Sequence, residues 1–281
     1  SNYYLRKSCR MCGGVSLTKV MSLTPTPPGN DFLTKDELGR DEPVYPLDLY
    51  FCKGCHHVQL GHVVDPQILY QKNYSYVSAT SAHFVNHLKS YAKEMVDRFG
   101  LQSGDLVGDI GSNDGTTLSF YEKKNLKIGI DPTAKKFKKF YNKDIKIIDS
   151  FFSSEIIKNH LKEKQAKVIT SFAMFYDLDS PLIFAKQIAE ILDKNFGIWV
   201  LEQSYLPEML KKLSFDTVCH EHLEYYSLIQ IDWIMKKAGL RIIDVEFNNV
   251  NGGSFAVTVC HKNSKLKPAP LKILKILQHE K

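Results

Sequence analysis

Two stretches of the chain carry side chains in patterns typical of a ligand site. The first is Val107–Gly115, a short apolar strand that runs into a turn with glycine at Gly111 and Gly115. Such a turn lets the backbone approach a ligand closely, and the N–H groups that open the next helix face that ligand. Asp131 follows a second predicted strand, at the spacing of a carboxylate that holds the two hydroxyls of a ribose. The segment is therefore predicted to bind an adenosine-type cofactor.

The turn differs from the commonest glycine-rich motif at Asn113, which stands where that motif has a central glycine. Asparagine tolerates left-handed backbone better than most residues, so the turn can still form. Asp109 either helps to fix the cofactor or caps the turn, and Phe151 and Phe152 either face an adenine or pack in the core. No G-x-x-x-x-G-K-[S/T] motif is present, which argues against a nucleoside triphosphatase. The predicted cofactor-binding residues are Asp109, Gly111, Asn113, Gly115, Asp131, Pro132, Ser171 and Phe172.

The second stretch is Cys219–Tyr226, in which His220 and His222 flank Glu221. Histidine titrates near neutrality, and glutamate can orient it or hold a substrate hydroxyl, so we interpret the stretch as an acid–base site. Three alternatives stay open. The histidines can be structural groups, or they can hold a metal, although the spacing is not His-Glu-x-x-His. Cys219 can be a nucleophile only if a base lies within reach.

Four of the six cysteines form two C-x-x-C pairs. Each pair makes a tight turn that aims two thiolates at one point. Two pairs give the tetrahedral thiolate coordination that zinc prefers in structural sites, with no open position for catalysis. We therefore predict a zinc-binding module over residues 1–65. Its predicted ligands are Cys9, Cys12, Cys52 and Cys55.

The segments around the cysteine pairs are less regular. Residues 24–30 are rich in proline and threonine and are predicted to be a rigid loop. Residues 66–103 are predicted to be a helical linker or substrate segment, because apolar residues recur every three or four positions in its second half. The hydroxyl-rich part before that helix is either an ordinary surface loop or a contact for a polar substrate such as a sugar. The histidines near the second cysteine pair are interpreted as surface or neighbouring groups rather than ligands: His56, His57 and His62.

From residue 105 onward, predicted strands alternate with predicted helices. The expected strands are 106–110, 127–131, 145–148, 167–171, 196–202, 241–247 and 254–261, and the expected helices are 114–124, 133–140, 153–162, 181–193 and 227–238. The turn signal Asn251–Gly253 predicts that the last two strands pair antiparallel. This order predicts an α/β fold with a seven-stranded Rossmann-like sheet over residues 104–265, the layout of class I S-adenosylmethionine methyltransferases. Residues 266–281 are predicted to be the start of a C-terminal helix or of a truncated further domain.

The composition is that of an ordinary globular protein. The 281 residues carry a formal charge of +6, with 43% hydrophobic and 24% charged residues. The lysines are spread over predicted helix faces, as in 135–139, so we expect no nucleic-acid partner. No apolar run reaches the length of a membrane span, and no signal peptide is recognised. We therefore expect a cytoplasmic protein without a membrane partner.

Several motifs together make the chain resemble a known family. In chain order they are the first cysteine pair, Tyr45–Leu47, the second cysteine pair, Gly111–Gly115, Cys219–Tyr226 and Asn251–Phe255. In this combination the chain resembles the sugar C-methyltransferases, which act on nucleotide-linked 4-keto-6-deoxy sugars. It differs from many members in having Cys219 where they have tyrosine. Members usually continue into a further C-terminal α/β domain, so we expect either a truncated chain or a short member.

The resemblance implies S-adenosylmethionine as methyl donor, structural zinc, and a dTDP- or GDP-linked sugar as acceptor. It implies methylation of a carbon next to a ketone, expected at C3, after a base removes a proton. His222 is our choice of base, with Glu221 and His220 orienting it or binding the sugar. The candidate donors to the keto oxygen are Tyr76, Ser78 and Ser204.

Two other classes of function are compatible with these motifs. A zinc module on a basic methyltransferase also suggests an RNA methyltransferase, although the chain lacks a basic stripe interleaved with aromatic residues. The second class is a catalytically silent binding module, in which the sheet is only a scaffold. It is less favoured because Gly111, Gly115 and Asp131 all have types that suit a cofactor site.

Overall fold

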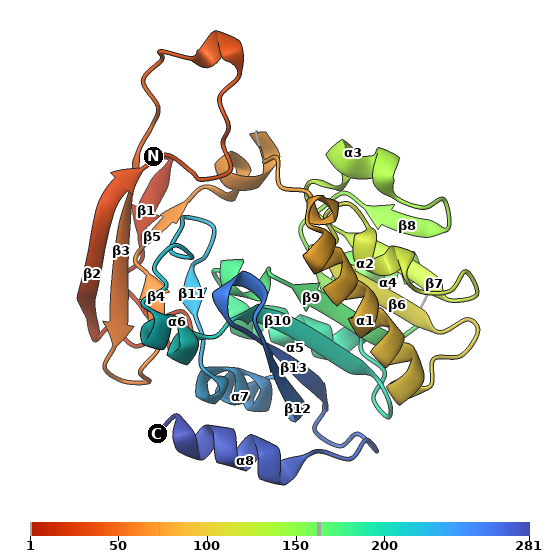
Figure 1. Cartoon of the computed structure of the whole chain (residues 1–281). Coiled ribbons are helices and arrows are strands. Elements are labelled where there is room, and N and C mark those ends of the chain that lie inside the picture. The colour runs from red at the N-terminus through yellow and green to blue at the C-terminus, as the bar shows by residue number, and fades with distance from the viewer. Residues whose placement is uncertain (1, 73, 162–163) are drawn as a thin grey trace.

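The computed structural model describes residues 2–72, 74–161 and 164–281. Its centre is a twisted sheet of seven strands in the order β12-β13-β10-β9-β6-β7-β8 (Figure 1). The five strands from β6 to β10 run parallel, and β13 lies antiparallel between β10 and β12. The strand bounds are β6 (Leu106–Ile110), β7 (Leu126–Ile130), β8 (Ile145–Ile148), β9 (Ala166–Phe172), β10 (Ile198–Ser204), β12 (Leu240–Asn248) and β13 (Ser254–His261). The predicted class, a seven-stranded sheet that closes with an antiparallel pair, is confirmed.

Helices cover both faces of the sheet, because alternate strand residues point to opposite sides. In β10, Trp199 and Leu201 join the core under α4, α5 and α7, whereas Ile198 and Val200 join the core under α1, α2 and α3. The helix bounds are α1 (Ala82–Phe99), α2 (Thr116–Ser119), α3 (Ala134–Phe137), α4 (Ser154–Leu161), α5 (Pro181–Ile191), α6 (Leu206–Lys212), α7 (Leu228–Lys237) and α8 (Pro270–His279). Within the part of the chain that is described, no helix is long and apolar enough to cross a membrane.

Three predicted elements differ from the structure. The helix predicted over 114–124 is the single turn α2, because the chain then folds into tight turns and the Lys127 ammonium binds the carbonyl of Tyr121 at 3.1 Å. The helix predicted over 133–140 is α3 followed by the 3₁₀ turn η4 (Lys138–Phe140). The loop predicted over 24–30 begins later, since β2 pairs with β3 as far as Thr26. Residue 162 of the helix predicted over 153–162 lies outside the described residues.

The N-terminal part forms two small sheets beside the central one (Figure 1). The strands β1 (Tyr3–Leu5) and β5 (His62–Val64) make a two-stranded sheet. A four-stranded sheet has the order β11-β4-β3-β2, where β2 is Leu17–Thr26, β3 is Tyr45–Cys52 and β4 is Val58–Leu60. Its edge strand β11 (Glu224–Tyr225) comes from the far end of the sequence. The Cys219–Tyr226 stretch is therefore held by the N-terminal sheet.

Short helical turns complete the connections. The turns are η1 (Lys35–Glu37), the π-helical η2 (Gln67–Lys72), η3 (Ser78–Thr80), η5 (Phe175–Asp177) and η6 (Val250–Gly252). After β13 the chain returns as α8, and the Glu280 carboxylate accepts hydrogen bonds from the amides of Leu228 and Ile229. These amides open α7, so the acid caps that helix and fixes the C-terminal segment against it.

The crowding at the first turn leads to a stability prediction. Gly115 and Gly100 both have positive φ, at 79° and 60°, but a Cβ at Gly115 would lie 2.6 Å from the Tyr141 ring, while Gly100 has open space around it. Gly100→Ala should lower the free energy of unfolding by about 1–2 kcal/mol, the cost of left-handed backbone. Gly115→Ala should lower it by a further ~1–3 kcal/mol of overpacking. Urea unfolding of both variants checks this, and equal losses would contradict it.

Candidate active site

A cavity of about 290 Å³ lies at the carboxyl ends of the parallel strands β6, β7 and β9, where open α/β sheets bind ligands. Its size is close to the lower end of the roughly 300–1,000 Å³ typical of small-molecule sites. The described lining residues include no lysine, arginine or histidine, but they include six carboxylates: Asp109, Asp114, Asp131, Asp177, Asp179 and Glu221. Asp179 is paired with Arg6 and Arg10 behind the lining, and the other acids at the cavity favour a ligand that carries positive charge.

Asp131 forms the part of the wall nearest the first turn. Its Oδ2 accepts a hydrogen bond from the Asn113 amide at 2.8 Å, and its Oδ1 accepts from the amide and hydroxyl of Thr133 at 2.6 and 2.5 Å. Burial raises the pKa of Asp131, and these hydrogen bonds oppose the rise. The carboxylate is thus fixed in one orientation at the cavity surface, as a ribose-binding acid needs to be.

The side chain of Asn113 has a role that the sequence did not reveal. Its Oδ1 accepts from the Ser78 amide at 2.9 Å, and its Nδ2 donates to the Tyr76 carbonyl at 3.0 Å. Asp114 accepts from the Ala79 amide at 3.0 Å in the same way. The turn therefore holds the hydroxyl-rich segment over the cavity, where Tyr76 and Ser78 line it. The sign of this contact in the sequence is that position 113, which has a positive φ of 49°, carries asparagine and not glycine.

Most of the predicted cofactor-binding residues line the cavity: Asp109, Gly111, Asn113, Asp131, Pro132 and Phe172. Ser171 does not, because its hydroxyl faces the interior and accepts from the Trp199 indole at 3.1 Å. Gly115 is also absent from the lining, and serves the turn through its amide, which donates to the Ser112 carbonyl.

Asp109 lines the cavity, and its side chain interacts with Thr170 on one side and with Thr117, in the helix that follows the turn, on the other. Its carboxylate accepts from the Thr170 hydroxyl at 2.6 Å on the neighbouring strand β9, and burial raises its pKa to about 7. Phe151 and Phe152 also line the cavity, and Phe152 packs against Phe184 with ring centroids 4.8 Å apart. Phe151 is 45% exposed, so its ring is the one left available to a flat ligand.

The opposite wall carries polar atoms that lack a partner. Tyr70, Asp177 and Glu221 line the cavity, and the Tyr70 hydroxyl, Asp177 Oδ1 and Glu221 Oε2 are buried without a hydrogen bond among the described residues. The other Glu221 oxygen, Oε1, accepts from Asn30 Nδ2 at 3.1 Å. Burial, reinforced by the nearby Glu221 carboxylate, raises the pKa of Asp177 well above its usual range. Unpaired buried polar atoms point to a bound polar ligand.

Of the predicted acid–base residues, Glu221 and Tyr76 reach the cavity surface. His222 lies outside the lining, with its ring centroid 4.0 Å from that of Tyr176. Its Nδ1 is 2.7 Å from the Thr217 carbonyl, and because a carbonyl can only accept, Nδ1 carries the proton and Nε2 keeps a lone pair. Burial lowers the pKa of His222, so the ring stays neutral at pH 7. This is the protonation state of a general base.

His220 and Cys219 have environments that do not suit catalysis. The buried His220 donates from Nε2 to the Tyr45 carbonyl at 3.1 Å, which matches the structural alternative. Burial, together with the nearby carboxylates of Glu221 and Asp177, raises the pKa of Cys219 well above that of a free thiol. A protonated thiol is a poor nucleophile, so the nucleophile alternative is not supported.

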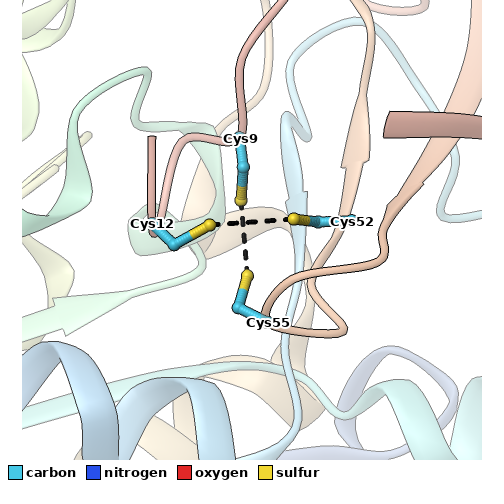
Figure 2. A group of neighbouring side chains, drawn as sticks. All are labelled: Cys9, Cys12, Cys52 and Cys55. Carbon is cyan, nitrogen blue, oxygen red and sulfur yellow. Dashed lines mark hydrogen bonds between the residues drawn. The ribbon is translucent and has the colours of Figure 1, made fainter. Parts of the chain in front are cut away.

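The four predicted zinc ligands converge on one point from two loops (Figure 2). All four sulfurs lie within 4.8 Å of one another, with Cys9 Sγ 3.5 Å from Cys55 Sγ and Cys12 Sγ 3.7 Å from Cys52 Sγ. A tetrahedral zinc with bonds of about 2.3 Å separates its sulfurs by about 3.8 Å, so the cluster fits zinc closely. His57 is fully buried beside the cluster, 3.5 Å from Glu224, and is not one of the metal-binding group found in the described residues.

Comparison with known proteins gives two family matches. Residues 9–70 match a family described as "Putative zinc binding domain", and residues 61–245 match one described as "Methyltransferase domain". The C-methyltransferase NovU of Streptomyces niveus is 29% identical over 251 residues, which cover 89% of this chain and 59% of NovU. The chain thus spans about three fifths of the length of that relative.

Solved structures with the same fold include two methyltransferases. The mitomycin 7-O-methyltransferase MmcR aligns with a TM-score of 0.51 and 14% identity, covering 65% of this chain and 55% of MmcR. The plantazolicin methyltransferase BpumL aligns with a TM-score of 0.50 and 11% identity, covering 66% of this chain and 88% of BpumL. At these identities the likeness concerns the fold. Because the methyltransferase match spans well over half of the residues, the chain belongs to the methyltransferase domain family and carries a zinc-binding-type domain before it.

Proposed function

We propose that the protein transfers a methyl group from S-adenosylmethionine to a carbon next to the ketone, at C3, of a nucleotide-linked 4-keto-6-deoxy sugar. The observation that carries this proposal is the cavity at the sheet edge, with a ribose-type acid on one wall and unpaired polar atoms on the other. In this account residues 104–265 bind the cofactor, residues 1–65 bind structural zinc, and residues 66–103 cover the cavity. The relative NovU, a C-methyltransferase, supports methylation at carbon.

The sheet-edge half of the cavity suits the cofactor. Asp131 would hold the ribose hydroxyls, Phe151 would face the adenine, and Asp109 would lie near the amino-acid end. When bound, S-adenosylmethionine supplies an electrophilic methyl group on a positively charged sulfur. The acid-only lining complements that sulfonium and the ammonium group of the same cofactor.

The opposite half suits a hydroxylated sugar. A sugar hydroxyl both donates and accepts, and here the Tyr70 phenol can donate while carboxylate oxygens of Asp177 and Glu221 can accept. A diphosphate has no cationic partner among the described lining residues, so we place the sugar ring in the cavity and the diphosphate outside it. The same lining disfavours the RNA methyltransferase alternative, because nucleic-acid phosphates would meet carboxylates at the cavity.

The proposed chemistry begins with the removal of the proton next to the ketone. In this proposal His222 takes the proton on the lone pair of Nε2. Because the ring lies outside the cavity lining, beside Tyr176 and with Nδ1 bound to the Thr217 carbonyl, it has to shift toward the cavity to do so. The Tyr76 hydroxyl lines the cavity and would stabilise the enolate oxygen. The new carbon–carbon bond then forms as the bond from sulfur to the methyl breaks, and the proton leaves from His222 to solvent. Glu221 is the second candidate base, because it reaches the cavity surface and His222 does not.

The reaction itself can be tested with a panel of acceptors. Incubation with S-adenosylmethionine and dTDP- or GDP-linked 4-keto-6-deoxy sugars should add one methyl group to one member of the panel, as read by mass spectrometry. Without the methyl donor, in deuterated water, the neighbouring carbon should exchange its hydrogen, because the base acts before methyl transfer. A panel in which no sugar gains mass, or methylation at oxygen, would sink the proposal.

The base can be identified by two variants and a pH profile. His222→Ala should lower kcat by about 10²–10⁴-fold, the usual contribution of a positioned base, while calorimetry shows cofactor affinity within about twofold. Glu221→Gln should mainly raise the KM for the sugar. Because the active histidine is neutral and burial lowers its pKa, the acidic limb of kcat should lie below pH ~6.5, the ordinary value. If Glu221→Gln loses kcat and His222→Ala does not, the roles are reversed.

The structural metal is tested by matched cysteine variants. Wild-type protein should contain one zinc per chain by elemental analysis, and Cys52→Ser should lose it and unfold at a lower temperature, since metal binding contributes folding energy. Cys260→Ala removes a buried cysteine outside the cluster and should keep the zinc. Zinc content that is the same in both variants would contradict the assignment.

A further inference from the structure

Arg10 lies between two of the cysteines of the zinc cluster in the sequence, and its side chain is buried in the protein. Its side chain is 0% exposed, and its NH1 donates to the Leu60 carbonyl at 2.5 Å. Its backbone amide donates to Gln59 Oε1 at 2.8 Å, and Gln59 Nε2 donates to the Ser8 carbonyl at 3.2 Å. The loop that carries the first cysteine pair is thus fixed to β4, and Arg10 has little freedom to move while the cluster is intact.

Arg10 also interacts with two carboxylates, the buried Glu224 and Asp179 at the cavity wall. Its Nε lies 2.9 Å from Asp179 Oδ1, and Arg6 NH1 lies 2.8 Å from the same oxygen. Arg6 also donates to the Asp179 carbonyl at 2.9 Å, and the Tyr4 hydroxyl donates to Asp179 Oδ2 at 2.9 Å. Asp179 therefore receives side chains from the N-terminal part only, in the contacts that the structure describes for it.

Asp179 ends the segment Met174–Asp179, which follows β9 and lines the cavity with four side chains. These are Met174, Asp177, Leu178 and Asp179. The segment is held locally by only two backbone hydrogen bonds, from the Asp177 amide to Met174 and from the Leu178 amide to Phe175. Phe175 and Tyr176 anchor the middle of the segment in the core, and the contacts of Asp179 fix its far end to the N-terminal part. The stretch that carries Glu221 is held by Leu60, the residue whose carbonyl also binds Arg10. The Leu60 amide donates to the Leu223 carbonyl at 2.9 Å.

We propose that Arg10 is a positioning residue, which transmits the geometry of the zinc cluster through Asp179 to the cavity wall Met174–Asp179. The metal would hold the first cysteine pair, the pair would hold Arg10, and Arg10 would hold the wall that faces the sugar. The sheet-edge half around Asp131 has its own hydrogen bonds, from the amides of Asn113 and Thr133, and it meets the wall at the Met174 side chain beside Gly111. That this wall faces the sugar rests on the proposed function; the coupling itself does not.

The burial of Arg10 explains why its contact with Asp179 can hold the wall in place. A buried charge that loses its partner is left uncompensated, so the pair holds firmly, whereas exposed ion pairs contribute little. Arginine can also contact Leu60 and Asp179 at once through its planar fork, which lysine cannot reproduce. Lysine at position 10 should therefore recover only part of the effect.

The test uses Arg10→Gln in the full, zinc-loaded chain, with Arg98→Gln as the matched control. Arg98 also pairs with an aspartate, Asp244 at 2.8 Å, but neither residue lines the cavity. Hydrogen exchange followed by mass spectrometry should show amides 175–179 exchanging about tenfold faster in Arg10→Gln, with amides 111–115 unchanged and one zinc per chain retained. Arg10→Lys should give an intermediate rate, and Arg98→Gln the wild-type rate at both segments.

Removing zinc from the wild-type chain with a chelator should produce the same local increase at 175–179. Cofactor affinity by calorimetry should stay within about twofold in Arg10→Gln, while the KM of the sugar identified by the panel rises about tenfold. If Arg10→Gln does not fold, Asp179→Asn breaks the same contact from the partly exposed side and is read in the same way. The inference is overturned if exchange at 175–179 is unchanged or if it rises equally at 111–115. If no sugar of the panel is methylated, that result counts against the proposed function alone, because the hydrogen-exchange data do not depend on turnover.

Discussion

The pairing of β11 with β4 is the contact on which the rest of the site depends. It brings a two-residue strand from near the end of the sequence, Glu224–Tyr225, onto the edge of the sheet that carries the second cysteine pair. Backbone hydrogen bonds of this kind leave no freedom of register where one face is buried. The three residues before β11 are therefore placed opposite the carboxyl edge of the central sheet, and Glu221 enters the cavity.

The cavity consequently has two halves of different origin. The sheet-edge half is local, because the turn after β6 and the acid after β7 come from adjacent parallel strands. The other half consists of Tyr70, the Met174–Asp179 segment and the stretch before β11. Contacts with the N-terminal part hold these segments together. Residues of the zinc-binding-type domain, Val63, Val64 and Leu69 among them, thus line the cavity. In the proposed function, this division separates methyl-donor binding from substrate choice.

The local features could be predicted from the sequence. The turn at Gly111, the acid at Asp131 and the cysteine cluster each depend on short spacings, and the structure brings each set together. Ser171 and Phe172 were both expected at the cofactor, but neighbours in a strand face opposite sides, so only Phe172 reaches the cavity.

The features that the sequence did not indicate depend on contacts between distant segments. Asp177 and Tyr70 became candidates only when the fold buried them without partners. Arg10 is a charged residue between two cysteines, and only the fold places its side chain inside the protein. The same holds for His222, whose neutral state follows from burial and from the Thr217 carbonyl. Residue type and spacing carry no information on such contacts.

The central claim is that one cavity holds the methyl donor on the sheet edge and the sugar on the wall that carries Tyr70, Asp177 and Glu221, which the N-terminal part holds in place. A crystal structure with S-adenosylhomocysteine and a 4-keto-6-deoxy nucleotide sugar tests it most directly. The account predicts ribose hydroxyls on Asp131, sugar hydroxyls on Asp177 and Glu221, and the diphosphate outside the cavity. A sugar ring bound elsewhere, or a diphosphate inside the acidic cavity, would contradict it.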